Sequence, residues 1–189
     1  MAYFSQLYSL ISSLPALKMT EDPSISSQEF LDNASTFMTD GELAVLSAVS
    51  LLPQEDKVFP ENSFSGKYQA WEKALRHSIL RLRTAKRKDL SSVSSVNRET
   101  VFDCDADAAA VRAYSAADPL ERERLLDAAR WEKASELILL HQFDLDVLCA
   151  YYLQLQLAEK WARRAAGNAA VNLDKAADLS KKSQTITKD

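Results

Sequence analysis

Glycine is scarce in this 189-residue sequence and occurs only at Gly41, Gly66 and Gly167. Phosphate-binding loops and dinucleotide-binding turns need closely spaced glycines, because their backbone N–H groups must approach the phosphates. Tight β-hairpins favour Asn-Gly or Asp-Gly, and Asp40-Gly41 is the single such pair in the chain. The scarcity of glycine therefore argues against a nucleotide-binding loop and against a β protein.

Helix-start signals recur along the whole chain. Ser26 with Glu29 and Thr39 with Glu42 have the spacing of capping boxes. The strongest start is the segment "DPLE", in which Asp118 is the cap, Pro119 the first helical residue and Glu121 the third residue after the cap. We predict further helices from Ser65 to about Lys88, from Asp105, from Asp118 to about Leu140, and from Asp144 to about Ala166, with Pro53 and Gly167 as stops.

These signals predict an all-α chain in a single domain over residues 1–180, with about six to seven helices. The two long C-terminal helices are expected to form an antiparallel hairpin. Residues 89–102, "DLSSVSSVNRETVF", are rich in serine and predict a break between helices. Residues 181–189 are polar and are expected to form a disordered tail.

The N-terminal segment "YFSQLYSLISSLPAL" resembles a secretory signal in being apolar. It has no Lys or Arg, and serines interrupt its apolar run, so the pattern favours a short amphipathic helix ending near Pro15. The apolar positions with helical spacing are Phe4, Leu7, Tyr8, Ile11 and Leu14. We expect these side chains to pack inward, against the final helix.

The final helix, "LDVLCAYYLQLQLAEKWARR", is apolar over more than half of its circumference. A helix of this kind is buried on most sides. Two interpretations remain open, since it is either the central helix of the bundle or a helix that a partner covers. Tyr151, Leu155 and Trp161 are candidate partner contacts on it.

Composition excludes several functions. The formal net charge is −4, which does not favour nucleic-acid binding. No apolar run approaches the roughly 18 residues that span a bilayer. The two cysteines and two histidines lack metal-ligand spacing, and His141 is expected to bond Asp144 or a helix end. We therefore predict no metal, no cofactor and no catalytic residues, so that the chain by itself is not an enzyme.

One stretch, "RHSILRLRTAKRK", has a pronounced positive charge. It supplies the remaining candidate partner contacts, which are Arg81, Arg83, Lys86, Arg87 and Lys88. One interpretation is a solvated helix end whose cations suit the negative end of the helix dipole. The other is an electrostatic patch for an acidic protein partner.

Four segments together resemble a known family. They are "YSLISSLPAL" with "SSQEFLDNAS", "YQAWEKALRHSILRLRTAK", "AADPLERERLLDAARWEKASEL" and "HQFDLDVLCAYYLQLQLAEKWAR". Their order is similar to that in a bacterial family of unknown biochemical role, whose genes lie in V/A-type ATPase operons. The gene position corresponds to that of the central-stalk socket, the helical protein that joins the central stalk to the membrane rotor ring. This chain is much shorter than that socket protein.

The resemblance implies a non-catalytic accessory or coupling subunit of a V/A-type ATPase. Its implied partners are the proteins of the central stalk or of the membrane rotor. It implies a cytoplasmic protein that meets the membrane only through the complex. The alternative is a helical assembly or interaction factor that is not retained in the mature complex.

Overall fold

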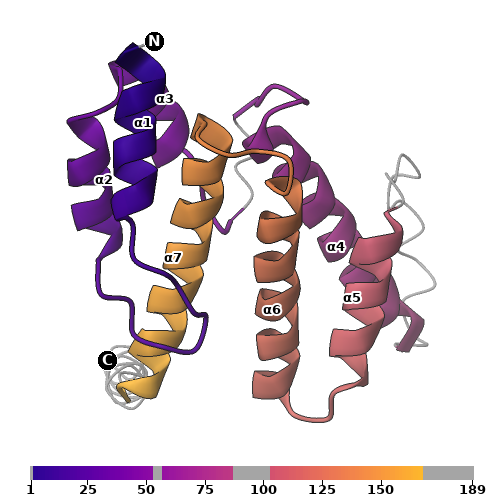
Figure 1. The fold of residues 1–189 in the computed structure, drawn as a ribbon. Coiled ribbons are helices and arrows are strands. Elements are labelled where there is room, and N and C mark those ends of the chain that lie inside the picture. The colour runs from indigo at the N-terminus through magenta and orange to yellow at the C-terminus, as the bar shows by residue number, and fades with distance from the viewer. Residues whose placement is uncertain (1, 53–56, 87–102, 168–189) are drawn as a thin grey trace, which may run out of the picture.

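The structure is a computed structural model that describes residues 2–52, 57–86 and 103–167 (Figure 1). Within these residues the chain forms seven α-helices and no strand, which confirms the predicted all-α fold. The helices are α1 (Ala2–Ser13), α2 (Ser27–Ser35), α3 (Asp40–Ser47), α4 (Phe64–Lys86), α5 (Cys104–Ser115), α6 (Pro119–Leu137) and α7 (Leu145–Ala165). The predicted break at 89–102 and tail at 181–189 lie outside the described residues.

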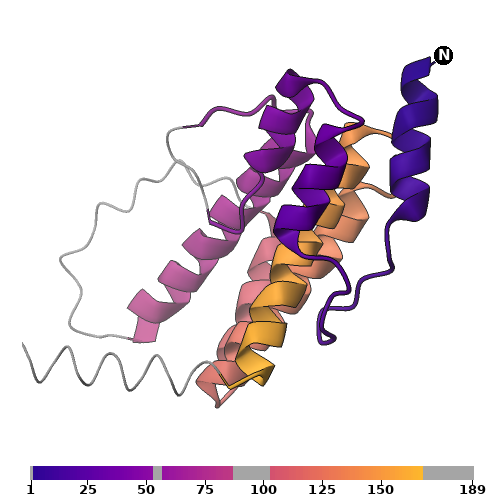
Figure 2. The ribbon, with the colours of Figure 1, turned by 90° about the vertical axis from the view of Figure 1, so that its left-hand side faces the viewer.

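Helix α7 lies at the centre of the molecule. Helices α2 and α3 pack against one side of it, and α4 and α6 pack against the other, while α5 lies on α4 and α6 (Figure 1). The view in Figure 2 places α1 at the edge of the molecule. Helices α6 and α7 run in opposite directions, so the two long C-terminal helices form the predicted antiparallel hairpin.

The burial of α7 decides between the two interpretations of its apolar surface. From Leu145 to Ala162 no residue is exposed. Its fully buried leucines are Leu148, Leu153, Leu155 and Leu157. The chain's own helices therefore surround α7, and it is the central helix of the bundle.

Short-range capping contacts explain where several helices begin. The backbone N–H of Ser26 donates to the Glu29 carboxylate at 2.9 Å, which confirms this capping box. Asp118 accepts from the N–H of Glu121 at 3.1 Å, with Pro119 as the first residue of α6. Asp144 likewise caps α7, and Gly167 follows the end of α7 with a φ of 76°.

Two predicted helix starts are corrected by two residues each. Helix α4 is capped by Ser63, whose hydroxyl accepts from the N–H of Gly66 at 3.2 Å, whereas Ser65 is buried inside the helix. Helix α5 is capped by Asp103, which accepts from the N–H of Ala106 at 2.9 Å, so Asp105 lies within the first turn. In each case the side-chain oxygen of the residue nearer the N-terminus accepts a hydrogen bond from the backbone N–H three residues later, which defines it as the cap.

Two helices end earlier than predicted. Helix α3 ends at Ser47, well before Pro53, and the carbonyl of Val49 beyond its end accepts a hydrogen bond from the side chain of Gln156 at 3.0 Å. That contact joins the segment after α3 to α7. Helix α6 ends at Leu137, and a turn through residues 138–144 follows.

Helix α1 packs inward through two leucines. Leu7 and Leu10 are nearly completely buried, although only Leu7 belongs to the predicted inward face. The prediction was wrong for Tyr8, which is 53% exposed and lies with its ring centroid 4.6 Å from that of Phe143. The side chain of Phe4 lies outside the described residues.

Hydrogen bonds tie the N-terminal part of the chain to α7. They join the Tyr151 hydroxyl to the Pro15 carbonyl at 3.0 Å, the Ser27 N–H to Glu159 at 2.6 Å, and the Gln156 amide to the Val49 carbonyl at 3.0 Å. Within residues 3–17 these bonds involve Pro15, after the end of α1, so the expected packing of the apolar face of α1 against α7 stays a prediction.

We predict that Gly66→Ala destabilises the protein. A Cβ at this position would lie 2.1 Å from the carbonyl oxygen of Pro60, so the backbone must shift. Overpacking of this kind costs about 1–3 kcal/mol, which urea unfolding would measure. Gly41→Ala is the control, because nothing lies within 4 Å of that Cβ, and it should leave stability unchanged or slightly increased. Equal stabilities for the two variants would contradict the close approach at Gly66.

Candidate functional site

Seven charged side chains from α4, α6 and α7 form a network that we call the charge cluster. Its carboxylates are Glu72, Glu123 and Asp127, and its cations are Arg76, Arg130, Lys160 and Arg164. Glu72 and Asp127 are each only 1% exposed. Ionisable residues are almost never this buried unless they are paired, so the geometry of the pairing defines what the cluster does.

Arg130 on α6 is the centre of the charge cluster. Its Nε and Nη2 donate to the two carboxylate oxygens of Glu72 on α4, at 3.0 and 2.9 Å. Its Nη1 donates to Asp127, one turn earlier on α6, at 2.8 Å. The fork-shaped guanidinium therefore fixes the orientation of α4 relative to α6.

Asp127 extends the charge cluster to α7. Its Oδ2 accepts from Lys160 Nζ at 2.6 Å and from the indole N–H of Trp161 at 3.0 Å. Lys160 also lies 2.7 Å from Glu123, and Arg164 lies 2.7 Å from the same carboxylate. Glu123 and Asp127 share a face of α6 because they are four residues apart.

The electrostatics of the charge cluster favour the ionised forms of Arg130 and Glu123. Burial alone would lower the pKa of Arg130, but its hydrogen bonds to Glu72 raise that pKa above the ordinary value. Burial would raise the pKa of Glu123, yet the donors Lys160 and Arg164 lower it below 4.5. The contribution of Glu123 to stability is therefore present above the unfolded-state pKa and is lost as the pH falls through the lower folded-state pKa.

The buried carboxylates of the charge cluster have their oxygens occupied. Glu72 accepts from Arg130 twice and from Arg76 at 2.8 Å. Asp127 accepts from Arg130, Lys160 and Trp161. A general base needs a free oxygen within reach of substrate. The arrangement suits holding three helices together rather than proton transfer.

Two buried polar groups near the charge cluster have no hydrogen-bond partner among the described residues. They are the hydroxyl of Tyr68 and the indole N–H of Trp71. Burial raises the pKa of Tyr68, and the negative charge of Glu72 raises it further. The Tyr68 hydroxyl therefore stays protonated at neutral pH.

The predicted basic contacts lie at the C-terminal end of α4. Arg81 is paired with Asp107 of α5, and the Arg81 side chain is still half exposed. Arg83 is exposed. The side chain of Lys86, and all of Arg87 and Lys88, lie outside the described residues. The described part of this patch is thus accessible, and a partner for it remains a prediction.

The three predicted contacts on α7 have different environments. Leu155 is fully buried within the chain and presents no surface to a partner. Trp161 is half-buried, and its indole N–H is used by Asp127. Tyr151 is half-buried and donates to Pro15, with a pKa that burial raises to about 12. Sequence periodicity alone does not distinguish the internal packing of Leu155 from a partner contact, and partner contacts at Tyr151 and Trp161 stay predictions.

His141 lies in the turn between α6 and α7, as expected. Its Nδ1 lies 2.6 Å from Asp144 and 3.8 Å from Asp146.

Among the described residues no group of three or more His, Cys, Asp or Glu side chains could hold a metal ion. In the same residues, no helix is both long and apolar enough to cross a membrane.

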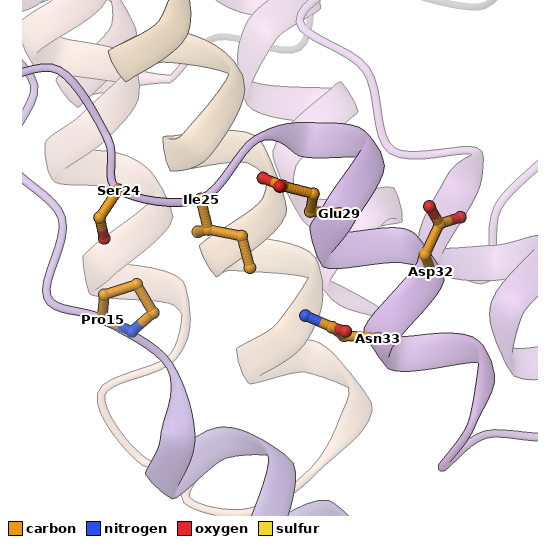
Figure 3. Close-up of a pocket in the computed structure, with 6 residues that line it drawn as sticks. All are labelled: Pro15, Ser24, Ile25, Glu29, Asp32 and Asn33. Atoms are coloured by element: carbon orange, nitrogen blue, oxygen red, sulfur yellow. The ribbon is translucent and has the colours of Figure 1, made fainter.

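Two depressions on the surface of the described residues are open to solvent. One of about 550 Å³ lies between the segment after α1 and α2, lined by Pro15, Ser24, Ile25, Glu29, Asp32 and Asn33 (Figure 3). Its carboxylates already have partners, since Glu29 caps α2 and Asp32 accepts from Gln28 at 2.9 Å. A second depression, of about 430 Å³ between α5 and α6, has Trp71 and alanines in its lining and is bordered by paired charges. Neither has the enclosed apolar lining typical of a small-molecule site.

Sequence reasoning missed the charge cluster. Glu72 and Asp127 each have an arginine three or four residues later, a spacing that also occurs on solvated helix faces. The sequence signal for the charge cluster is the position of its carboxylates among apolar residues. Glu72 directly follows Trp71 on the apolar side of α4, and Asp127 lies between Leu126 and two alanines. A charge at an apolar register position indicates a buried pair.

The described residues form an all-α fold in which the buried charged side chains pair with one another and join helices. A family described as a protein of unknown function (DUF2764) matches residues 108–169. This match covers about a third of the chain and spans most of α5 with the whole of the α6–α7 hairpin. Neither a curated protein nor a solved structure matches the sequence.

We predict that Asp127→Asn destabilises the protein strongly. The change removes one of the two carboxylates that pair with Arg130, and it leaves Lys160 with the partly exposed Glu123 alone. Breaking a buried pair in this way costs up to about 3–5 kcal/mol. Glu121→Gln is a matched control on the same helix, because the Glu121–Arg124 pair is about half exposed and should contribute less than about 1 kcal/mol. Chemical unfolding of both variants measures the difference. Similar small losses in the two would show that the cluster is not critical for the fold.

We predict that only one of the two thiols reacts in the native protein. Cys104 is exposed, whereas burial raises the pKa of Cys149 on α7 to about 12, so its thiolate is scarce at pH 8. Titration with a disulfide reagent should count one thiol in the native protein and two in denaturant. Cys104→Ser should leave none reactive in the native state, and a fast-reacting Cys149 would contradict the burial of α7.

Proposed function

We propose that the chain is a non-catalytic accessory or coupling subunit of a bacterial V/A-type ATPase. The observation that carries the proposal is the resemblance of four ordered segments to a family encoded in such operons. These segments form α1 with α2, α4, α6 and α7. Of these helices, α4, α6 and α7 build the packed centre of the molecule, whereas α1 lies at its edge.

The chemistry of the described residues supports a binding role. The buried carboxylates are occupied by cations, and the surface depressions are open and lined by paired charges. The central-stalk socket is the functional analogy, with the central stalk or the membrane rotor as partner. On this proposal the protein is cytoplasmic and is held at the membrane only by the complex.

A helical assembly factor that leaves the mature complex is the alternative. Co-purification with the ATPase under gentle conditions distinguishes a permanent subunit from an assembly factor. A stoichiometric band in the mature ATPase supports the permanent component, and a transient association during assembly supports the factor. Absence from the ATPase at every stage would reject both.

We predict that neutralising the basic end of α4 weakens association and leaves folding intact. The variant changes Arg81, Arg83, Lys86, Arg87 and Lys88 to Gln. Exposed charges contribute less than about 1 kcal/mol each to stability, but they accelerate association with an acidic partner at low salt. The melting temperature should stay nearly constant, while ATPase co-purification at low salt should fall.

The matched control for this variant removes five exposed cations elsewhere on the chain. They are Lys18, Lys57, Lys67, Lys73 and Arg124. This control changes the net charge equally, so any difference between the two variants reports the location of the charge. If both variants bind alike, the cations of α4 are a solvated helix end.

A further inference from the structure

The turn between α6 and α7 exposes two consecutive leucines. Among the described residues of this turn, Leu139 is 76% exposed and Leu140 is 98% exposed. Phe143, further along the same turn, is 37% exposed and lies against the half-exposed ring of Tyr8. Single exposed apolar residues are ordinary, but four large ones on or against one turn indicate a contact surface.

The turn is held in a defined shape. The N–H of His141 donates to the Ile138 carbonyl at 2.9 Å, and the N–H of Leu139 donates to the Glu136 carbonyl at 3.2 Å. The ring of His141 is bonded to Asp144, which in turn caps α7. The leucines therefore project from a fixed backbone, so that burying them against a partner requires little ordering of the chain.

The charges around the leucines indicate the kind of partner. From Glu136 to Asp146 the chain has three carboxylates and no Lys or Arg. Glu136 is paired with Lys133 at 3.0 Å, while the Asp144 side chain is 43% exposed and faces only His141 among the ion pairs. The last turn of α6 has no basic residue, and the negative end of the α6 dipole meets the positive end of the α7 dipole at this turn, so the negative charge comes from Asp144 and Asp146.

We propose that the α6–α7 turn is a docking surface for a protein partner that presents an apolar helix face flanked by Lys or Arg. Leu139 and Leu140 supply the apolar contact, and Asp144 with Asp146 supplies the complementary charge. An anionic membrane surface has the same sign of charge as the turn and is disfavoured. The inference rests on the proposed function, because it names the surface through which an accessory protein of the complex holds its partner.

The test uses the full chain and a labelled amphipathic helix of leucine and lysine as the probe. The protein should bind this peptide, and Leu139→Ser/Leu140→Ser should weaken binding by at least about tenfold. A leucine–glutamate peptide of the same length should bind at least about tenfold more weakly than the lysine peptide. Because both leucines are exposed, the variant should fold normally, which its melting temperature checks.

Val111→Ser/Leu120→Ser is the matched control, because these two residues are about half exposed on α5 and at the start of α6. It should change peptide binding by less than about twofold. Equal weakening by both variants, or unchanged binding by the leucine variant, overturns the docking surface. Leucine-dependent binding to anionic vesicles, or leucine-dependent dimerisation in sedimentation, overturns it in favour of a membrane or a second copy.

Co-purification with the ATPase separates this inference from the proposed function. If the wild-type chain binds the lysine peptide through Leu139 and Leu140 but no component of the ATPase, the proposed function fails and the docking surface stands. If the chain co-purifies with the ATPase and the leucine variant loses neither interaction, the docking surface fails and the proposed function stands.

Discussion

The ion pair between Arg130 and Glu72 is the interaction on which the arrangement of the bundle depends. It joins residues 58 positions apart, and Asp127 connects the same guanidinium to α7 through Lys160 and Trp161. Buried ion pairs often add little net stability, because the loss of hydration offsets their attraction. Removing one partner is costly, however, since the others remain buried and charged. We infer that the charge cluster selects which faces of α4, α6 and α7 meet, while apolar burial supplies most of the stability.

Helix α7 connects this cluster to the N-terminal part of the chain. One side of it faces α4 and α6, and another accepts α2 and α3. Its polar side chains form hydrogen bonds with elements on both sides. Lys160 donates to Asp127 of α6, and Glu159 accepts from the N–H of Ser27 at the start of α2. The wide apolar surface of this helix is therefore explained by neighbours on several sides. Leu155 illustrates this, because its complete burial is produced by the chain itself.

The features that were predictable from sequence are those fixed by nearby residues. Ser26 with Glu29, and Asp118 with Glu121, are helix starts whose partners lie three residues away. The all-α fold and the C-terminal hairpin follow from such starts and from periodicity. The pairing of Arg130 with Glu72 was not predictable, because it depends on which helices become neighbours. The hydrogen bond between the Val49 carbonyl and Gln156 of α7 was equally unpredictable, since it joins residues 107 positions apart.

The position of α4 relates the two candidate contact surfaces to each other. The N–H of Phe64, at the start of α4, donates to Asp146 at the start of α7, so this end of α4 lies beside the α6–α7 turn. Arg81 and Arg83 lie toward the other end of α4, a helix of 23 residues and thus about 34 Å long. An apolar, acidic surface and a basic surface therefore lie toward opposite ends of one rigid helix. A protein that joins two partners needs two separated surfaces of this kind, whereas a factor that shields one partner needs only one. On the proposed function, two such surfaces suit a coupling subunit better than an assembly factor that binds one partner.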